Sequence, residues 1–325
     1  MLAAFAVAAA LAAGVNSYTP QTLVTNQSDP SLVNGWGLSA GPATPWWVAD
    51  NGTSLSTLYQ GTGAKVALTV TVPGGPTGTV FNGDPTAFAG GRFLFANEAG
   101  QILSWAPGTT VATVRADLGP QGAIFKGLTL LDGRLYATDF HNGKVVVFDS
   151  KYAPVQTSGG FADKTLPKGY APFGIQALAG SIFVTYALQD AQGKDELDKP
   201  GKGIVDQFTP DGVLVARVMK QGGKNAPPNA PWGLALAPAS FGVFSGDVLI
   251  GNFGNGRISA YEQRGGKWVY RGQLRKGDGT IVVIDGLWAI AFGNGAAAGP
   301  TTSLYWAAGP NDEKAGAFGV LTANG

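Results

Sequence analysis

The sequence predicts an all-β fold, and within that class a six-bladed β-propeller. Three observations support this prediction: the composition, a unit that recurs six times, and turn dipeptides between short apolar runs. Hydrophobic residues are 45% of the 325 residues and charged residues 13%, which leaves ample apolar surface for a core. The 50 glycines and 20 prolines suit many short strands joined by tight turns.

The recurring unit begins with an aromatic residue, a glycine and an aliphatic residue. Clear copies are Trp36-Gly37-Leu38, Phe173-Gly174-Ile175 and Trp232-Gly233-Leu234, and looser ones are Pro85-Thr86-Ala87, Lys126-Gly127-Leu128 and Trp288-Ala289-Ile290. A second apolar run follows each start, at 46–50, 92–98, 134–139, 181–186, 247–252 and 303–309. A third run follows at 56–60, 101–107, 144–149, 203–210, 257–263 and 318–323. Units of roughly 40–60 residues with three or four strands are typical of propeller blades.

The turns and the chain ends fit the same architecture. Asn-Gly or Asp-Gly stands at 51–52, 132–133, 142–143, 211–212 and 255–256, and such pairs favour tight hairpins. The alternating run KVALTVTV at 65–72 predicts a fourth strand for the first blade. The last unit shows three strands, so we expect residues 18–25 to supply its fourth and to close the ring.

Residues 1–17 read MLAAFAVAAALAAGVNS, an apolar run of small residues with the A-x-A-like site Ala10-Leu11-Ala12. This pattern predicts a signal peptide, with an ordinary N-terminal helix as the alternative. The domain prediction is therefore a signal-like segment at 1–17 and a propeller at 18–325, in a secreted, periplasmic or cell-surface protein. No other stretch approaches transmembrane length.

Composition excludes several function classes. The net charge of +1 gives no basic footprint for nucleic acid. The absence of cysteine excludes disulfides, thiolate zinc sites and cysteine nucleophiles. A single histidine leaves few acid–base pairs for catalysis.

In a propeller, the first strand of each blade starts at the face where the second strand ends, so these positions ring one mouth of the central channel. Polar residues at these positions predict a Ca²⁺ site, because Ca²⁺ takes six to eight oxygen ligands. The candidate ligands are Asn34, Glu98, Asp139, Asn252 and Asp285. The alternative is that these residues cap strand ends through Asx turns.

The same mouth is the expected ligand site. The polar insertion LQDAQGKDELDKPGKG at 188–203 should overhang it, and long loops on rigid scaffolds commonly carry function. Candidate ligand-binding residues are Trp36, Asp190, Trp232 and Asn311, although the aromatic residues Trp36, Phe173, Trp232 and Trp288 are better explained as packing between blades.

The only histidine, His141, lies in ATDFHNGKVVVF at 137–148. Aligned with IGNFGNGRISAY at 250–261, this stretch places Asp139 on Asn252 and His141 on Gly254. We therefore expect His141 to occupy a turn rather than to catalyse a reaction. Asp139, Asp285 and His141 are the catalytic candidates if the protein is an enzyme.

Several segments carry a resemblance: NGWGLSAGPATPWWVADNGT, APWGLALAP, VLIGNFGNGRISAY, IDGLWAIAFGNG and AAGPNDEKAGAFG. Together they resemble an uncharacterised family of exported bacterial propeller proteins, some of which carry a PEP-CTERM sorting signal, whereas this chain ends LTANG. The blade pattern is also similar to NHL-repeat propellers and to calcium-dependent lactonase and phosphotriesterase propellers. The resemblance implies export, and by analogy of fold a cation at the channel mouth.

The predicted function is a binding module of the cell envelope or extracellular space, with a glycan, peptide or small molecule at the mouth. The alternative is a Ca²⁺-dependent hydrolase or lyase, in which Ca²⁺ would polarise a substrate oxygen. A purely structural repeat protein is the third possibility.

Overall fold

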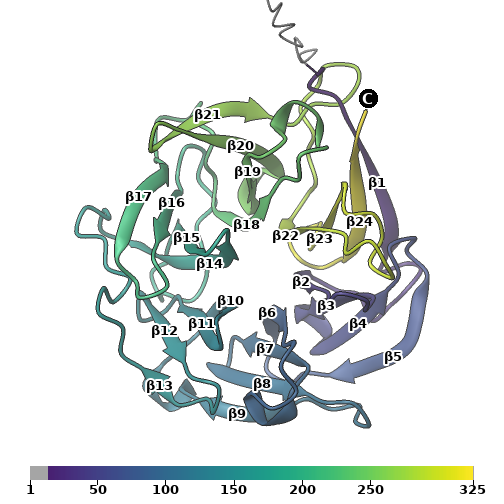
Figure 1. Ribbon diagram of the computed structural model, residues 1–325, viewed down its shortest axis with the longest axis vertical. Helices are drawn as coiled ribbons and strands as arrows, with labels where there is room; N and C mark the ends of the chain where they lie inside the picture. The colour runs from purple at the N-terminus through teal and green to yellow at the C-terminus, as the bar shows by residue number, and fades with distance from the viewer. Residues whose placement is uncertain (1–13, 325) are drawn as a thin grey trace, which may run out of the picture.

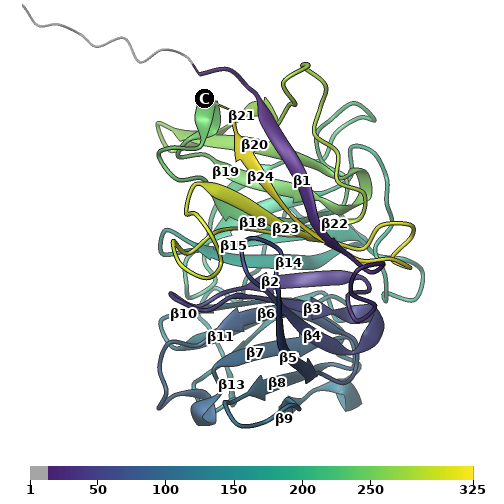
Figure 2. The same ribbon diagram turned by 90° about the vertical axis from the view of Figure 1, so that its right-hand side faces the viewer.

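Six four-stranded antiparallel sheets surround a common axis, so the chain is a six-bladed β-propeller (Figure 1). This computed structural model describes residues 14–324. The innermost strand of each sheet lies beside the axis (Figure 1), and Figure 2 shows the same ring of sheets from the side. The predicted fold class is confirmed.

Each blade runs from an inner to an outer strand in chain order, except that the outer strand of the sixth blade is β1. Blades one to three consist of β2 (Gly35–Ser39), β3 (Trp46–Asp50), β4 (Leu55–Tyr59), β5 (Lys65–Thr71), β6 (Pro76–Phe81), β7 (Phe93–Asn97), β8 (Gln101–Trp105), β9 (Thr113–Asp117), β10 (Phe125–Leu131), β11 (Arg134–Asp139), β12 (Lys144–Phe148) and β13 (Pro154–Val155). Blades four to six consist of β14 (Tyr170–Leu178), β15 (Ser181–Leu188), β16 (Ile204–Phe208), β17 (Leu214–Met219), β18 (Pro231–Leu236), β19 (Val248–Asn252), β20 (Arg257–Arg264), β21 (Lys267–Gln273), β22 (Leu287–Phe292), β23 (Ser303–Ala308), β24 (Ala317–Ala323) and β1 (Tyr18–Thr25).

Short 3₁₀ turns interrupt the connections between strands. They are η1 (Asn51–Thr53), η2 (Phe88–Gly90), η3 (Gly119–Gln121), η4 (Gly242–Phe244) and η5 (Phe253–Asn255). A helix of the length and apolarity needed to cross a bilayer is not found between residues 14 and 324.

The ring closes as the sequence predicts. β1 pairs antiparallel with β24, from Tyr18 opposite Ala323 to Thr25 opposite Ala317. The two strands lie side by side in both views (Figures 1 and 2). Strand β1 thus supplies the outer strand of the sixth blade, and the N- and C-terminal parts of the fold are held together by one sheet. Most of the predicted signal-like segment, residues 1–13, lies outside the described residues.

The glycine of the recurring unit lies where neighbouring inner strands approach most closely. A Cβ atom at Gly174 would lie 2.2 Å from the carbonyl oxygen of Trp232, and one at Gly37 would lie 2.3 Å from that of Thr77. Each inner strand also shifts register against its partner at this point, for example between Gly35 and Leu38. The repeat therefore requires glycine for close packing, and the register shift changes the direction of the preceding side chain.

The second blade begins earlier than the sequence prediction placed it. Its inner strand is β6, so Thr77-Gly78-Thr79 is the true copy of the unit, and Pro85-Thr86-Ala87 lies after that strand. A Cβ at Gly78 would lie 2.4 Å from the backbone nitrogen of Leu128, as the repeat requires. This copy was not recognised in the sequence because threonine replaces the aromatic residue. The Thr77 hydroxyl is buried and donates to Phe125 O at 2.9 Å, which explains the substitution.

The turn dipeptides behave differently from one another. Asp132 and Gly133 both have positive φ, at 48° and 72°, as a two-residue hairpin of mirror-image type requires. In contrast, Asn51 and Asn255 lie within 3₁₀ turns and do not have positive φ. The strands at these positions are joined as predicted, but by a different turn.

Candidate functional site

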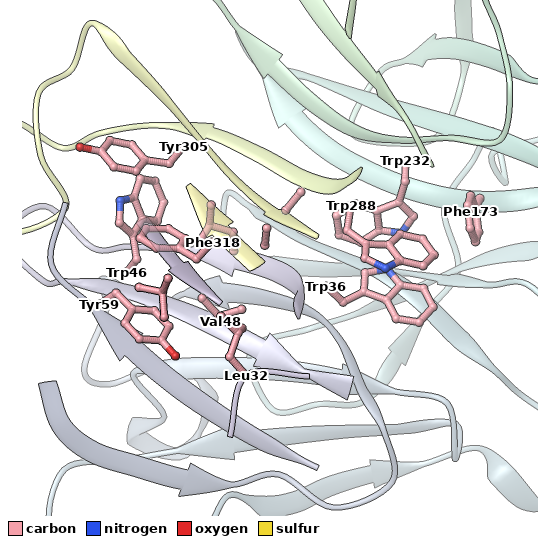
Figure 3. Packing of buried hydrophobic residues seen from close by; sticks show 14 of the residues in the cluster. Leu32, Trp36, Trp46, Val48, Tyr59, Phe173, Trp232, Trp288, Tyr305 and Phe318 are labelled. Atoms are coloured by element: carbon pink, nitrogen blue, oxygen red, sulfur yellow. The ribbon is translucent and has the colours of Figure 1, made fainter. Parts of the chain in front are cut away.

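An aromatic cluster fills the axis at the channel mouth, the face where the inner strands start. Trp36 and Trp288 stack with ring centroids 3.8 Å apart, and Trp232 contacts Trp288 edge to face at 5.9 Å. Phe173 and Phe253 pack on Trp288 at 5.8 and 3.9 Å. Figure 3 shows Phe173 and the three indoles together on one side of the core view. These side chains pack against one another, which confirms the packing explanation of the aromatic residues.

Lys126 belongs to the same ring of positions and replaces an aromatic residue there. Its side chain is 1% exposed, and its Nζ lies 2.6 Å from Glu98 Oε1 and 3.0 Å from Asp195 Oδ1. The ammonium group also lies 5.0 Å from the ring centroid of Trp36. Burial acts to lower the pKa of Lys126, but attraction to Glu98 and Glu196 outweighs it and raises the pKa. Lys126 is therefore charged.

Amide side chains extend this network around the mouth. Asn51 donates to Glu98 Oε2 at 3.0 Å, and Asn34 donates to Glu313 Oε2 at 2.5 Å. The Asn34 carbonyl oxygen in turn accepts the indole N–H of Trp288 at 2.8 Å. These hydrogen bonds connect the Glu313 carboxylate, through Asn34, to the aromatic cluster below it.

Glu313 is presented by an unusual turn. Asn311, Asp312 and Glu313 all have positive φ, at 59°, 51° and 62°. Side chains other than glycine rarely adopt this conformation, and consecutive cases need support from their surroundings. Support comes from Asp285, whose Oδ2 accepts the Asn311 N–H at 3.0 Å. The left-handed turn directs the Glu313 carboxylate onto Asn34.

The 188–203 loop folds over the mouth, as the sequence predicts. Gln189 pairs with Glu196 in an isolated antiparallel bridge, and Asp195 reaches Lys126. Gln189 Nε2 donates to the carbonyl oxygen of Phe140 at 2.6 Å, which attaches the loop to the third blade.

Three carboxyl groups at the mouth are held in an unfavourable environment. Burial, with repulsion from Glu313 and Asp198, raises the pKa of Glu196 to about 8 despite the nearby Lys126. Burial also raises the pKa of Glu313 and the pKa of Asp198. In contrast, although burial opposes it, attraction to Lys126 lowers the pKa of Glu98. Attraction to Lys126 therefore outweighs burial at Glu98 but not at Glu196 or Glu313.

A buried acceptor accompanies these acids. Asn229 is 3% exposed, and its Oδ1 has no hydrogen-bond partner among the residues that the structure describes. This oxygen and Asp198 Oδ1 both lie against Gly254, 2.5 and 2.7 Å from where a Cβ would stand. The mouth therefore offers unsatisfied acceptor oxygens from two blades.

His141 occupies the exposed turn that the alignment predicts. Its Nδ1 lies 3.3 Å from the carbonyl oxygen of Gly193, at the tip of the 188–203 loop. The side chain thus contacts the loop that covers the mouth, and it does not touch the carboxylates around Lys126.

The five predicted metal ligands are not gathered into one set. Asn34 and Glu98 belong to the mouth network, whereas Asp139 and Asn252 are fully buried and bonded to their own turns. Asp139 accepts from Asn142 N–H and Nδ2 at 3.2 and 2.8 Å. Asn252 Nδ2 donates to Arg257 O in its own turn at 3.1 Å, and its Oδ1 accepts the Asn229 N–H at 3.0 Å. Within residues 14–324, no group of three or more His, Cys, Asp or Glu side chains is arranged to hold a metal ion.

The other predicted site residues are distributed around the mouth. Trp36 and Trp232 lie in the aromatic cluster, while Asp285 and Asn311 are exposed partners in the Glu313 turn. Asp190 accepts the backbone N–H groups of Gln192 and Lys194 at 3.1 and 2.8 Å, so it shapes the loop. The structure adds Asn51, Lys126, Glu196 and Glu313 to the site. The available signal for Lys126 was a lysine at a repeat position that is aromatic in most blades. The turn that places Glu313 has no sequence signature.

Comparison with other proteins supports the fold. No family model matches the chain. Uncharacterized protein R648 of Acanthamoeba polyphaga mimivirus is 29% identical over 291 residues, which is 82% of this chain and 71% of that protein. Uncharacterized protein R640 of the same virus is 30% identical over 214 residues, 64% of this chain but only 38% of that protein.

Solved structures with a similar fold include several enzymes. A streptogramin B lyase structure aligns with a TM-score of 0.60 at 12% identity, over 94% of this chain and 98% of the lyase. Virginiamycin B lyase from Staphylococcus aureus aligns at 0.58 and 10% identity, over 95% and 100%. The apo form of the soluble aldose sugar dehydrogenase from Escherichia coli aligns at 0.60 and 13% identity, over 95% and 100%. At these identities the likeness shows the propeller fold alone.

Proposed function

We propose that this protein is a binding module whose channel mouth takes a ligand with a positively charged group, under the 188–203 loop. The observation that carries this proposal is the carboxylate excess at the mouth. Glu98, Asp195, Glu196 and Glu313 lie around a single buried cation, Lys126, and Asp198 lies close enough to Glu196 to repel it. An amine or guanidinium group of a peptide or small molecule would neutralise the acids that Lys126 leaves unsatisfied.

The aromatic cluster supports the binding role because it closes the axis beneath these acids. Trp36 and the buried Lys126 ammonium, 5.0 Å from its ring centroid, lie beneath the carboxylate and amide oxygens that a ligand at the mouth would meet. The loop that carries Glu196 forms the cover. Rigid blades beneath a polar loop fit recognition of a small group rather than of an extended surface.

A thermal-melt screen tests this proposal with spermidine, arginine amide and calcium chloride as probes. A ligand that binds only the folded state raises stability by RT ln(1 + [L]/Kd), so the midpoint should rise with probe concentration. We expect spermidine or arginine amide to raise it, and Glu196→Gln to reduce the rise. Asp312→Asn is the matched control, because Asp312 is a 92% exposed rim carboxylate outside the network. Equal responses of wild type and Glu196→Gln, or no response to any probe, would reject the proposal.

A calcium-dependent hydrolase or lyase is the second candidate function. The cation bound by the mouth would then be Ca²⁺, with Glu98 and Asn34 among its ligands. Lys126 argues against it, because its ammonium group already lies between Glu98 and Asp195, where a metal ion would compete with it. Stabilisation by calcium chloride, but not by the amines, would favour this candidate.

Export is part of the proposal, because the apolar run at 1–17 is the reason to expect a secreted, periplasmic or cell-surface protein. Fractionation of cells that express the full chain tests it. Removal of the N-terminal segment in the exported fraction supports export, and recovery of uncleaved protein only inside the cell opposes it.

A further inference from the structure

A cavity lies on the face opposite the mouth, in a groove between blades four and five. Its volume is about 430 Å³, within the usual range of small-molecule sites. The groove is formed by the turn between β14 and β15, the start of β19 and the hairpin of β20 and β21. Its polar lining consists of Ser181, Gln207, Ser245, Asp247, Glu262, Gln263 and Arg271.

Asp247 is a buried carboxylate that lines this groove. The residue is 3% exposed, and its Oδ2 has no hydrogen-bond partner within the described part of the chain. The nearest cationic atom, Arg271 Nε, lies 3.8 Å away, which is too far for a hydrogen bond. An unpaired carboxylate in such a position is costly unless a group from outside supplies a donor.

Trp268 forms an apolar wall of the groove and is held in a fixed orientation. Its ring packs edge to face on Phe183, with centroids 5.7 Å apart. Its indole N–H donates to Gln207 Oε1 at 3.1 Å, and Gln207 Nε2 donates to Ser181 Oγ at 3.0 Å. Because the indole is only partly buried, part of its surface faces the cavity.

The charged groups around the groove balance each other. Arg271 donates to Glu262 Oε2 at 2.8 Å, and Arg264 lies 2.6 Å from the same oxygen. Two arginines thus face two acids, Glu262 and Asp247, and the groove attracts neither a cation nor an anion strongly. A neutral ligand with many hydroxyl groups suits a free carboxylate oxygen, a guanidinium group and an apolar wall.

We propose that this groove binds a neutral saccharide. Sugar hydroxyls donate to Asp247 and accept from Arg271, while the C–H face of the ring packs on Trp268. Leu178 and Leu236 line both this groove and the open end of the central channel, a cavity of about 460 Å³. The site therefore has room to continue from one sugar unit toward the axis, which favours a short oligosaccharide.

Calorimetric titration with neutral oligosaccharides of glucose, galactose, mannose and N-acetylglucosamine, and with the free monosaccharides, tests this inference. We expect at least one sugar to bind at millimolar concentration, with the oligosaccharide binding more tightly than its monosaccharide. Asp247→Asn and Trp268→Ala should weaken binding about tenfold or more, because each removes a main contact. Lys267→Ala, an exposed neighbour on β21 that does not line the groove, is the matched control.

Trp268→Phe keeps an aromatic ring against Phe183 and serves as a second variant if Trp268→Ala unfolds. Glu196→Gln should leave sugar binding unchanged, because Glu196 lies on the opposite face. This variant distinguishes sugar binding in the groove from ligand binding at the mouth. No binding of any sugar to the wild type, or equal binding by wild type, Asp247→Asn and Trp268→Phe, would overturn the inference.

Discussion

The ammonium group of Lys126 joins carboxylates from two other parts of the chain at the channel mouth. Glu98 comes from the end of the second blade's β7 strand and Asp195 from the loop of the fourth blade. Glu98 is 25% and Asp195 53% exposed, so solvent weakens the second ion pair more than the first. Lys126 is thus an internal cation that occupies part of the proposed binding site.

Lys126→Met should therefore destabilise the protein by about 2–4 kcal/mol, since it leaves Glu98 without its buried partner. Urea unfolding measures this change. Calcium chloride should restore part of the loss, because the vacated space is bordered by Glu98 and Asp195. Glu98→Gln in the Lys126→Met background should also recover stability. A variant as stable as the wild type would show that the network does not depend on this cation.

The raised pKa of the Glu196 carboxyl predicts that the stability of the fold depends on pH. Its pKa is raised from 4.5 to about 8, so the folded protein holds this proton more tightly than the unfolded chain. Stability should then fall as the pH rises from about 4.5 to about 8, and this part of the slope should vanish in Glu196→Gln. At pH 8 the variant should be more stable by on the order of 1–2 kcal/mol. Urea unfolding at several pH values checks this; parallel curves would contradict it.

At the scale of the element, the inner strands depend on a glycine that the repeat places between neighbouring backbones. Gly174→Ala would bring a Cβ within 2.2 Å of the Trp232 carbonyl oxygen, and the blades would have to separate. We expect a loss of about 2–3 kcal/mol of stability. Gly223→Ala is the control, because its Cβ meets nothing within 4 Å and its φ is not positive. A Gly174→Ala variant as stable as this control would contradict the close-packing account.

The strand pattern could be predicted from the sequence because apolar alternation and the aromatic–glycine unit recur in nearly every blade. The second blade was misplaced because Thr77 occupies the position that elsewhere holds a bulky residue. The expected mouth follows from the rule that strand starts and ends meet at one face, and the structure places Asn34 and Glu98 in the hydrogen-bond network there. Glu313 was not among the predicted residues, because its position depends on three consecutive left-handed residues. The turn hydrogen bonds of Asp139 cannot be distinguished from metal ligation in the sequence, so its metal role stays a prediction.

At the scale of the whole molecule, one strand closes the ring. Strand β1 pairs along the length of β24 and buries Val24 and Tyr18, and the Tyr18 ring packs on Phe241 and Phe244 of the fifth blade. Deleting residues 1–25 should remove about 5 kcal/mol of apolar burial and lower the melting midpoint by roughly 10 °C or more. A deletion of residues 1–13, which leaves β1 itself in place, is the control. Equal midpoints for the two deletions would show that ring closure by β1 does not stabilise the propeller.

The two faces of the propeller have different chemistry. The mouth carries excess carboxylates above an aromatic floor, and the opposite face has a charge-balanced groove lined by Asp247 and Trp268. The two proposed sites, for a cationic group and for a neutral saccharide, therefore lie on opposite faces of the propeller.

The most direct test of the central claim is calorimetric titration of the mouth with spermidine at pH 7 in buffers of different ionisation enthalpy. Because the pKa of Glu196 is about 8, a bound cation should expel its proton. The account predicts saturable binding with net proton release in the wild type, and release that is reduced or absent in Glu196→Gln. Absence of binding, or binding with the same proton release in both proteins, would contradict it.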